Sequence, residues 1–166
     1  MMPAYRTPVP ASAAWLTAAG AIPFVAGAAT AWLAGPLPSE LAVRALIAYG
    51  AVILSFIGGI HWGFVISASA PLKRRWGLLS AATLPALLAW VALLLAPERG
   101  IAAVAAGLTA VLLLDRWSWA HNLAPGWWMR LRIPVTAVAV SCLVAAAASP
   151  PVAVPRTIPA AVVIEV

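Results

Sequence analysis

The feature that most constrains this chain is a succession of apolar runs, each about as long as a helix needs to cross a bilayer. About 20 helical residues, rising 1.5 Å each, span the ~30 Å of membrane hydrocarbon. The chain has 166 residues, of which 64% are hydrophobic and 8% are charged. A soluble domain has roughly 45–50% apolar and about 25% charged residues. The sequence therefore predicts an all-α integral membrane protein.

Proline, glycine and charged residues divide the apolar sequence into five runs, which predict transmembrane helices at about 12–34, 43–70, 76–96, 101–119 and 131–149. The segment 1–11 is polar, and the proline-rich tail 150–166 has the composition of a disordered segment. The first run is longer than the ~7–15 apolar residues of a signal-peptide core, so we expect it to be retained. The fourth is uninterrupted only from Ile101 to Leu114, and a re-entrant segment is its alternative.

The positions of Lys and Arg predict the orientation, because connections on the inside of a membrane carry an excess of them. With five spans, one side carries Arg6, Lys73, Arg74, Arg75, Arg116, Arg130 and Arg132, and the other carries Arg44, Arg99 and Arg156. A re-entrant fourth run would move three of the first group to the other side and reverse the excess. The distribution therefore favours five spans, with the N-terminus inside and the C-terminus outside. It also accounts for the net charge of +6 without a nucleic-acid partner.

The second run carries small residues four positions apart, which places them in one row along a helix: Ala51, Ser55, Gly59, Gly63 and Ser67. Such a row lets a neighbouring backbone approach closely, and Gly59 with Gly63 matches the small-xxx-small pattern of associating membrane helices. The same geometry serves packing within one subunit. We interpret the row as internal packing, with self-association as the alternative.

Three ionisable residues form the candidate ligand site. His61 interrupts the second apolar run away from the small-residue row, and an ionisable group at membrane depth is a functional candidate. Asp115 ends the fourth run and His121 follows it, so the predicted topology places both on the same side as the inner end of the second helix. Imidazole and carboxylate together suit a metal, and two histidines suit haem. A neutral histidine bonded to a neighbouring helix, and a local Asp115–Arg116 pair, are the structural alternatives.

Recognisable enzyme motifs are missing from the sequence. It has no phosphate-binding glycine loop, no His-Glu-x-x-His and no paired intramembrane carboxylates. The only acidic residues are Glu40, Glu98, Asp115 and Glu165, which leaves few groups for acid–base chemistry. We therefore expect no enzyme, no catalytic residue and no metal site.

Two stretches carry a family resemblance: Gly20-Ala-Ile-Pro-Phe24, and Tyr49 to Gly63 with its Ile-Gly-Gly-Ile-His-Trp-Gly ending. The likeness continues through Leu84-Pro85, Trp90, Leu114-Asp115 and Trp127 to Arg132. The chain resembles a bacterial and mitochondrial family of unknown function that includes transmembrane protein 69, domain-of-unknown-function family 3429. The resemblance implies a small multi-pass protein, here of a bacterial inner membrane, and implies no activity.

The leading functional hypothesis is an accessory subunit or assembly factor that meets another integral membrane protein within the bilayer, because the polar connections are short. The alternative is a membrane protein that binds haem, quinone or lipid through His61, with Asp115 or His121. Permeation of a small solute is the weaker alternative, because it requires a polar-lined route.

Overall fold

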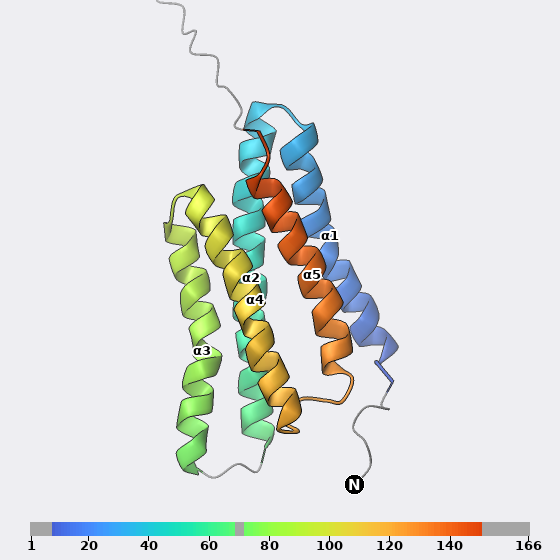
Figure 1. Cartoon of the computed structure of the whole chain (residues 1–166), viewed down its shortest axis with the longest axis vertical. Helices are drawn as coiled ribbons and strands as arrows, with labels where there is room; N and C mark the ends of the chain where they lie inside the picture. Colours follow the sequence, from blue (N-terminus) through green and yellow to red (C-terminus); the bar gives the residue numbers. More distant parts are fainter. Residues whose placement is uncertain (1–7, 69–71, 151–166) are drawn as a thin grey trace, which may run out of the picture.

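The computed structural model describes residues 8–68 and 72–150, with only the backbone at 72–74 (Figure 1). In chain order its helices are α1 (Ala11–Leu33), α2 (Pro36–Ser67), α3 (Leu72–Leu94), α4 (Pro97–Ala120) and α5 (Trp128–Ala147). All five contain a stretch that is long and apolar enough to cross a membrane. The prediction of an all-α chain with five such helices is confirmed. The tail 150–166 and most of the segment 1–11 lie outside the described residues.

All five helices begin earlier than the apolar runs do, and α2 differs most. α2 begins at Pro36 rather than near residue 43, and α5 begins at Trp128 rather than at residue 131. Proline is tolerated in the first turn of a helix, where its missing N–H has no intrahelical partner to lose. Gly35 precedes α2 in an extended conformation, so the Gly-Pro-Leu-Pro sequence starts the helix instead of forming a separate turn.

The fourth helix is continuous over its 24 residues, Pro97–Ala120. The sequence predicted this helix at about 101–119, with an apolar run uninterrupted only to Leu114 because Asp115 and Arg116 follow it. The backbone passes through both without a break, so α4 has the length of a full span. Asp115 can lie inside a helix at this position because its side chain is turned into the bundle, where it has partners.

The helices run alternately up and down around α2, which contacts all four others. α3 packs on α2 and α4, and α1 packs on α2 and α5. The N-terminal end of α1, the C-terminal end of α2 and the α4–α5 connection lie at one end of the bundle, the lower end in Figure 1. The α1–α2 and α3–α4 connections lie at the upper end.

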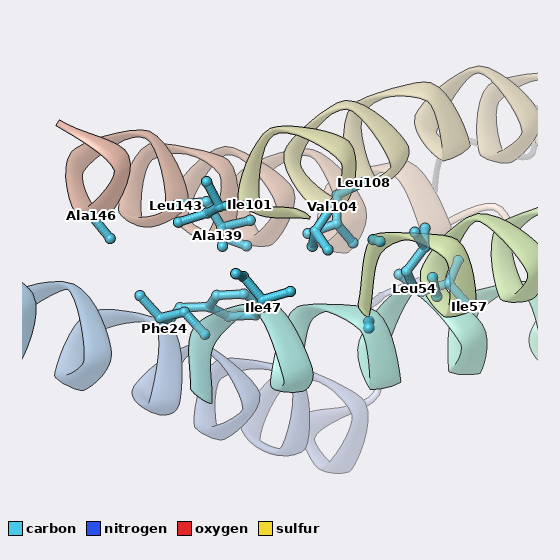
Figure 2. Close-up of a cluster of buried hydrophobic side chains, with 14 of the residues drawn as sticks. Phe24, Ile47, Leu54, Ile57, Ile101, Val104, Leu108, Ala139, Leu143 and Ala146 are labelled. Carbon is cyan, nitrogen blue, oxygen red and sulfur yellow. The ribbon is translucent and has the colours of Figure 1, made fainter. Parts of the chain in front are cut away.

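The core lies where α1 and α2 face α4 and α5, as Figure 2 shows. Its largest fully buried apolar side chains are Leu46, Leu54, Ile101, Val104, Leu108 and Leu143. The outside of the bundle is apolar as well: Leu33 is 85% exposed, Trp15 78% and Trp76 77%. Soluble monomers rarely expose so much contiguous apolar surface. A helix that is apolar on all sides belongs in a membrane or a large core, and here the lipid supplies the missing contacts.

The glycine that brings α2 and α3 together is Gly58, and the small-residue row lies elsewhere. A Cβ added at Gly58 would lie 2.7 Å from the backbone oxygen of Ala82. A Cβ added at Gly59 or Gly63 would meet no described atom within 4 Å. The interpretation of the row as internal packing is therefore wrong for Gly59 and Gly63, although Ala51 in the same row is buried. Ser55 is partly buried and Ser67 is exposed.

Candidate functional site

Three helices bring ionisable side chains together near the lower end of the bundle. Asp115 of α4 is 0% exposed, His61 of α2 2% and Arg132 of α5 7%. The Nε of Arg132 lies 2.8 Å from Oδ2 of Asp115, and Nε2 of His61 lies 3.4 Å from Oδ1. Buried charges are stable when they are paired and hydrogen-bonded. We call these three residues the charge cluster.

Both oxygens of the Asp115 carboxylate accept a hydrogen bond from α5. The indole Nε1 of Trp128 donates to Oδ1 at 2.7 Å, and Nε of Arg132 donates to Oδ2 at 2.8 Å. Trp128 and Arg132 lie four residues apart, which puts them on one face of α5. The two hydrogen bonds thus connect α4 to α5, and they fix the positions of both the Arg132 guanidinium and the Asp115 carboxylate.

His61 supports the charge cluster from α2. Its Nδ1 lies 3.0 Å from the carbonyl oxygen of Ile57, and because a carbonyl only accepts, Nδ1 is the donor. Nε2 is within ion-pair distance of Asp115 but lacks hydrogen-bond geometry, and it has no hydrogen-bond partner among the described residues. His61 therefore brings α2 into contact with the Asp115 carboxylate.

Two further polar atoms are buried without a partner in the described part of the chain. They are Nη2 of Arg132 and Oγ1 of Thr136, which is 4% exposed. Thr136 lies one turn beyond Arg132, on the same face of α5. A buried donor left unsatisfied costs about 1–3 kcal/mol, so a hydrogen-bond partner for either atom would stabilise the bundle.

Both side chains line a pocket of about 480 Å³ between α1, α2 and α5. Most of the lining is apolar: Ala13, Leu16, Gly20, Phe24, Ile53, Phe56, Ile57, Ile60, Leu108, Leu131, Val135 and Ala139. Leu16 and Phe56, at 75% and 64% exposure, also form part of the outer surface, so the pocket opens towards the lipid. The hydroxyl of Tyr49, another lining residue, donates to the carbonyl of Gly20 at 2.9 Å. Pockets of 300–1,000 Å³ with few polar groups are typical small-molecule sites.

The structure brings together two of the three residues that the sequence put forward. His61 and Asp115 lie in contact, but Asp115 pairs with Arg132 rather than with Arg116 in the interactions described. His121 follows α4, is exposed, and stacks on Trp117 with ring centroids 4.2 Å apart. None of its described interactions reaches His61 or Asp115. Within residues 8–68 and 72–150, no three His, Cys, Asp or Glu side chains form a metal-binding group.

The sequence reading missed Arg132, Trp128 and Thr136. We counted Arg132 only among the charges that predict the orientation, although it is the second residue of the predicted helix 131–149. In the structure Arg132 lies one turn inside α5 and is buried. The four-residue spacing of Trp128, Arg132 and Thr136 was the available signal, since it predicts one polar face on an otherwise apolar helix.

The comparisons with known proteins confirm the family resemblance. The family described as "Protein of unknown function (DUF3429)" matches residues 9–148. The chain is 41% identical over 140 residues to Transmembrane protein 69 of Xenopus tropicalis, covering 81% of this chain and 53% of the relative. It is 34% identical over 137 residues to Transmembrane protein 69 of Mus musculus, covering 81% and 55%.

The chain spans about half the length of these curated relatives. No solved structure matches it. The charge cluster and the pocket lie within the matched region, since His61, Asp115 and Arg132 all fall between residues 9 and 148. The protein is a multi-pass membrane protein, and it belongs to the family of unknown function DUF3429.

Proposed function

We propose that this protein binds an amphipathic small molecule of the bilayer in the pocket between α1, α2 and α5. The observation that carries the proposal is the pair of buried polar atoms, Arg132 Nη2 and Thr136 Oγ1, which have no partner in the described structure and belong to two residues that line that pocket. A molecule with an acceptor oxygen and an apolar body would satisfy both and fill the remaining space. The role is one of binding, without catalysis.

The ligand contacts proposed here differ from those that the sequence suggested. His61 is not among the residues that line the pocket, and its Nε2 lies beside Asp115. The described lining offers no histidine or cysteine to an iron atom, which favours a quinone or a lipid over haem. In this proposal Arg132 and Thr136 contact the ligand, while Asp115 and His61 position Arg132.

Native mass spectrometry of protein extracted in a mild detergent tests the proposal. The wild type is expected to carry a bound quinone or lipid that survives removal of the detergent. Thr17→Trp should displace it, because Thr17 lines the pocket on α1 and an indole ring would occupy the volume. Ala18→Trp is the matched control, since Ala18 is exposed on the same helix and is not a lining residue.

Loss of the bound molecule in Thr17→Trp alone supports the pocket as its site. Equal loading of the wild type and both variants would place any bound lipid on the outer surface and would overturn the proposal. Bare protein in all three would overturn it as well.

A second candidate function is that of an accessory subunit or assembly factor, and it is favoured by the open face of α2. Gly59, Gly63 and Ser67 are exposed on this face, beside the exposed side chains of Phe56 and Ile66. A row of small residues with large apolar neighbours suits the helix of another membrane protein, because it allows close backbone contact.

Co-purification from native membranes tests this second candidate. Leucine at both Gly59 and Gly63 should remove a stoichiometric partner, because the added side chains hold the partner's backbone away from α2. Ala18→Leu, on the exposed face of α1, should retain it. A partner that stays bound to the double variant, or the absence of any partner with the wild type, contradicts this role.

We also infer an inner-membrane location of the bacterial type, with the N-terminus inside. Arg116 and Arg130 lie at the lower end of the bundle, and Arg44 and Arg99 at the other, which supports this orientation through the excess of positive charge inside. A reporter fused at the C-terminus that is active only outside the membrane should be active. Permeation is the least favoured role, because the described polar cluster is confined to one end of the bundle.

A further inference from the structure

The charge of the pocket wall points to the chemical class of the ligand. Arg132 is the only charged side chain among the described residues that line the pocket. Asp115, which pairs with Arg132, is not among the lining residues, so the described wall presents a guanidinium and no carboxylate, and a cationic head group would find no acidic partner there. From this we infer that the ligand is an acidic amphiphile, with a carboxylate or phosphate on an acyl chain. The inference rests on the proposed function and makes its ligand specific.

Arg132 is held in a way that leaves part of its guanidinium available to such an acid. Asp115 accepts a hydrogen bond from Nε of Arg132, while Nη2 of Arg132 has no acceptor in the described structure. The carboxylate of Asp115 accepts from Trp128 and Arg132 on its two oxygens, so its position is fixed. Asp115 therefore orients Arg132, and the remaining N–H groups can bind an anion. Arginine favours carboxylate and phosphate because these accept strong, charge-assisted hydrogen bonds.

Thr136 supplies a second donor, as a comparison with other helical threonines shows. Thr30, Thr83 and Thr109 each donate their hydroxyl to the carbonyl four residues earlier, at 2.9 Å. This is the usual way for a threonine to satisfy its hydroxyl inside a helix. Thr136 is more deeply buried than these three, yet its hydroxyl makes no such bond. One turn of α5 thus carries two unpartnered polar groups on residues that line the same pocket.

The position of the donors fits an acid at the membrane surface with a chain directed inwards. Arg132 lies four residues into α5, about 6 Å from its start at 1.5 Å per residue. The pocket wall continues along α5 from Trp128 to Ala139, a rise of about 17 Å. An extended acyl chain can lie along this wall, against Phe24 and Ile53 of the neighbouring helices.

The test compares ligands that differ only in the head group. The protein is placed in nanodiscs of phosphatidylcholine, and binding of radiolabelled palmitic acid is measured with hexadecanol, methyl palmitate and palmitoyl lysophosphatidic acid as competitors. Saturable binding of palmitic acid is expected, with the alcohol and the ester at least about tenfold weaker, as for loss of a hydrogen bond to a charged group. Stronger competition by the lysophosphatidic acid would identify a phospholipid rather than a free fatty acid as the source of the acid.

Two variants test whether the bound acid accepts hydrogen bonds from Arg132 and Thr136. Arg132→Gln and Thr136→Val should each weaken palmitic acid binding by about tenfold to hundredfold, the range for loss of a hydrogen bond to a charged group. Thr136→Val keeps the Asp115–Arg132 pair, so it is informative even where Arg132→Gln fails to fold. Neither variant should change the weak binding of hexadecanol.

The outcomes separate this inference from the proposed function. Equal affinity for the acid, the alcohol and the ester, each blocked by Thr17→Trp, would overturn the acidic class and leave a pocket for a neutral amphiphile. Acid binding that survives unchanged in Thr136→Val and in folded Arg132→Gln would also overturn it. No saturable binding of any of the four compounds would overturn the acidic class, while a molecule that the wild type retains and Thr17→Trp loses in native mass spectrometry would still support the pocket.

Discussion

The buried pair between Asp115 and Arg132 provides a sharp test of the physical argument. We consider Asp115→Leu, Arg132→Met and the double variant, which replace the charged groups with apolar side chains. Each single change leaves one charge buried without its partner. The double change leaves neither. The energy of the pair therefore shows as non-additivity between the two sites.

The size of the change in the free energy of unfolding follows from the contacts and burial of Asp115. Asp115 accepts from Trp128 at 2.7 Å and from Arg132 at 2.8 Å, and it is fully buried. Removing one partner of a buried pair costs about 3–5 kcal/mol. We expect that loss for each single variant. The double variant should lose only about 1–3 kcal/mol, because its remaining defect is the unpaired indole N–H of Trp128. The coupling between the two sites should then be about 3 kcal/mol or more.

The assay is reversible unfolding in mixed detergent micelles with rising sodium dodecyl sulfate, followed by far-UV circular dichroism and tryptophan fluorescence. Glu40→Gln is the control, because Glu40 forms an exposed pair with Arg44 in which the two side chains are 58% and 60% exposed. Exposed pairs contribute about 0–1 kcal/mol, so this variant should unfold almost like the wild type. Additive losses at Asp115 and Arg132 would refute the reasoning, as would losses no larger than that of the control.

Other variants test single contacts in the same unfolding assay. Gly58→Ala should destabilise the protein by about 1–3 kcal/mol, because its Cβ would lie 2.7 Å from the backbone oxygen of Ala82. Gly59→Ala, one residue further on the open face, should be neutral or slightly stabilising, and equal effects at the two glycines would contradict the packing described. Trp128→Phe keeps the ring but removes the hydrogen bond to Asp115, and we expect a loss of about 1–3 kcal/mol. An unchanged stability would mean that this bond contributes nothing.

The fold was largely predictable from the sequence, because the length of each apolar run and the position of its flanking charges are properties of one segment and do not depend on packing. Five apolar runs predicted five helices, and the alternating charges predicted which connections share one end of the bundle. The errors arose where local signals conflict. The prolines before residue 43 suggested a turn, but Pro36 occupies the first turn of α2, where proline is compatible with a helix.

The site was only half predictable, because it depends on packing between distant segments. His61 stood out as an ionisable residue in an apolar run, and Asp115 as a charge at the end of one. Arg132, near the start of the predicted fifth helix, was counted with the charges that set the orientation, since sequence position alone does not distinguish such an arginine from a buried one. The missing information was that α5 begins at Trp128, which moves Arg132 one turn into the bundle and opposite Asp115.

The small-residue row shows a similar limit. Its four-residue spacing predicted a packing face on α2, and Ala51 is indeed buried. The glycine that faces α3 is Gly58, outside the row, whereas Gly59 in the row faces outwards. Adjacent helical residues point about 100° apart, so the choice between them depends on where α3 lies.

The most direct test of the proposed binding of an acidic amphiphile is a crystal structure from a lipidic phase, using protein purified without removal of its bound lipids. We expect ordered density in the pocket between α1, α2 and α5. An acid group should lie within hydrogen-bond distance of both Arg132 Nη2 and Thr136 Oγ1, with an acyl chain along α5 towards Ala139. A pocket closed by α1, or one in which a water molecule alone bridges Arg132 and Thr136, would contradict it.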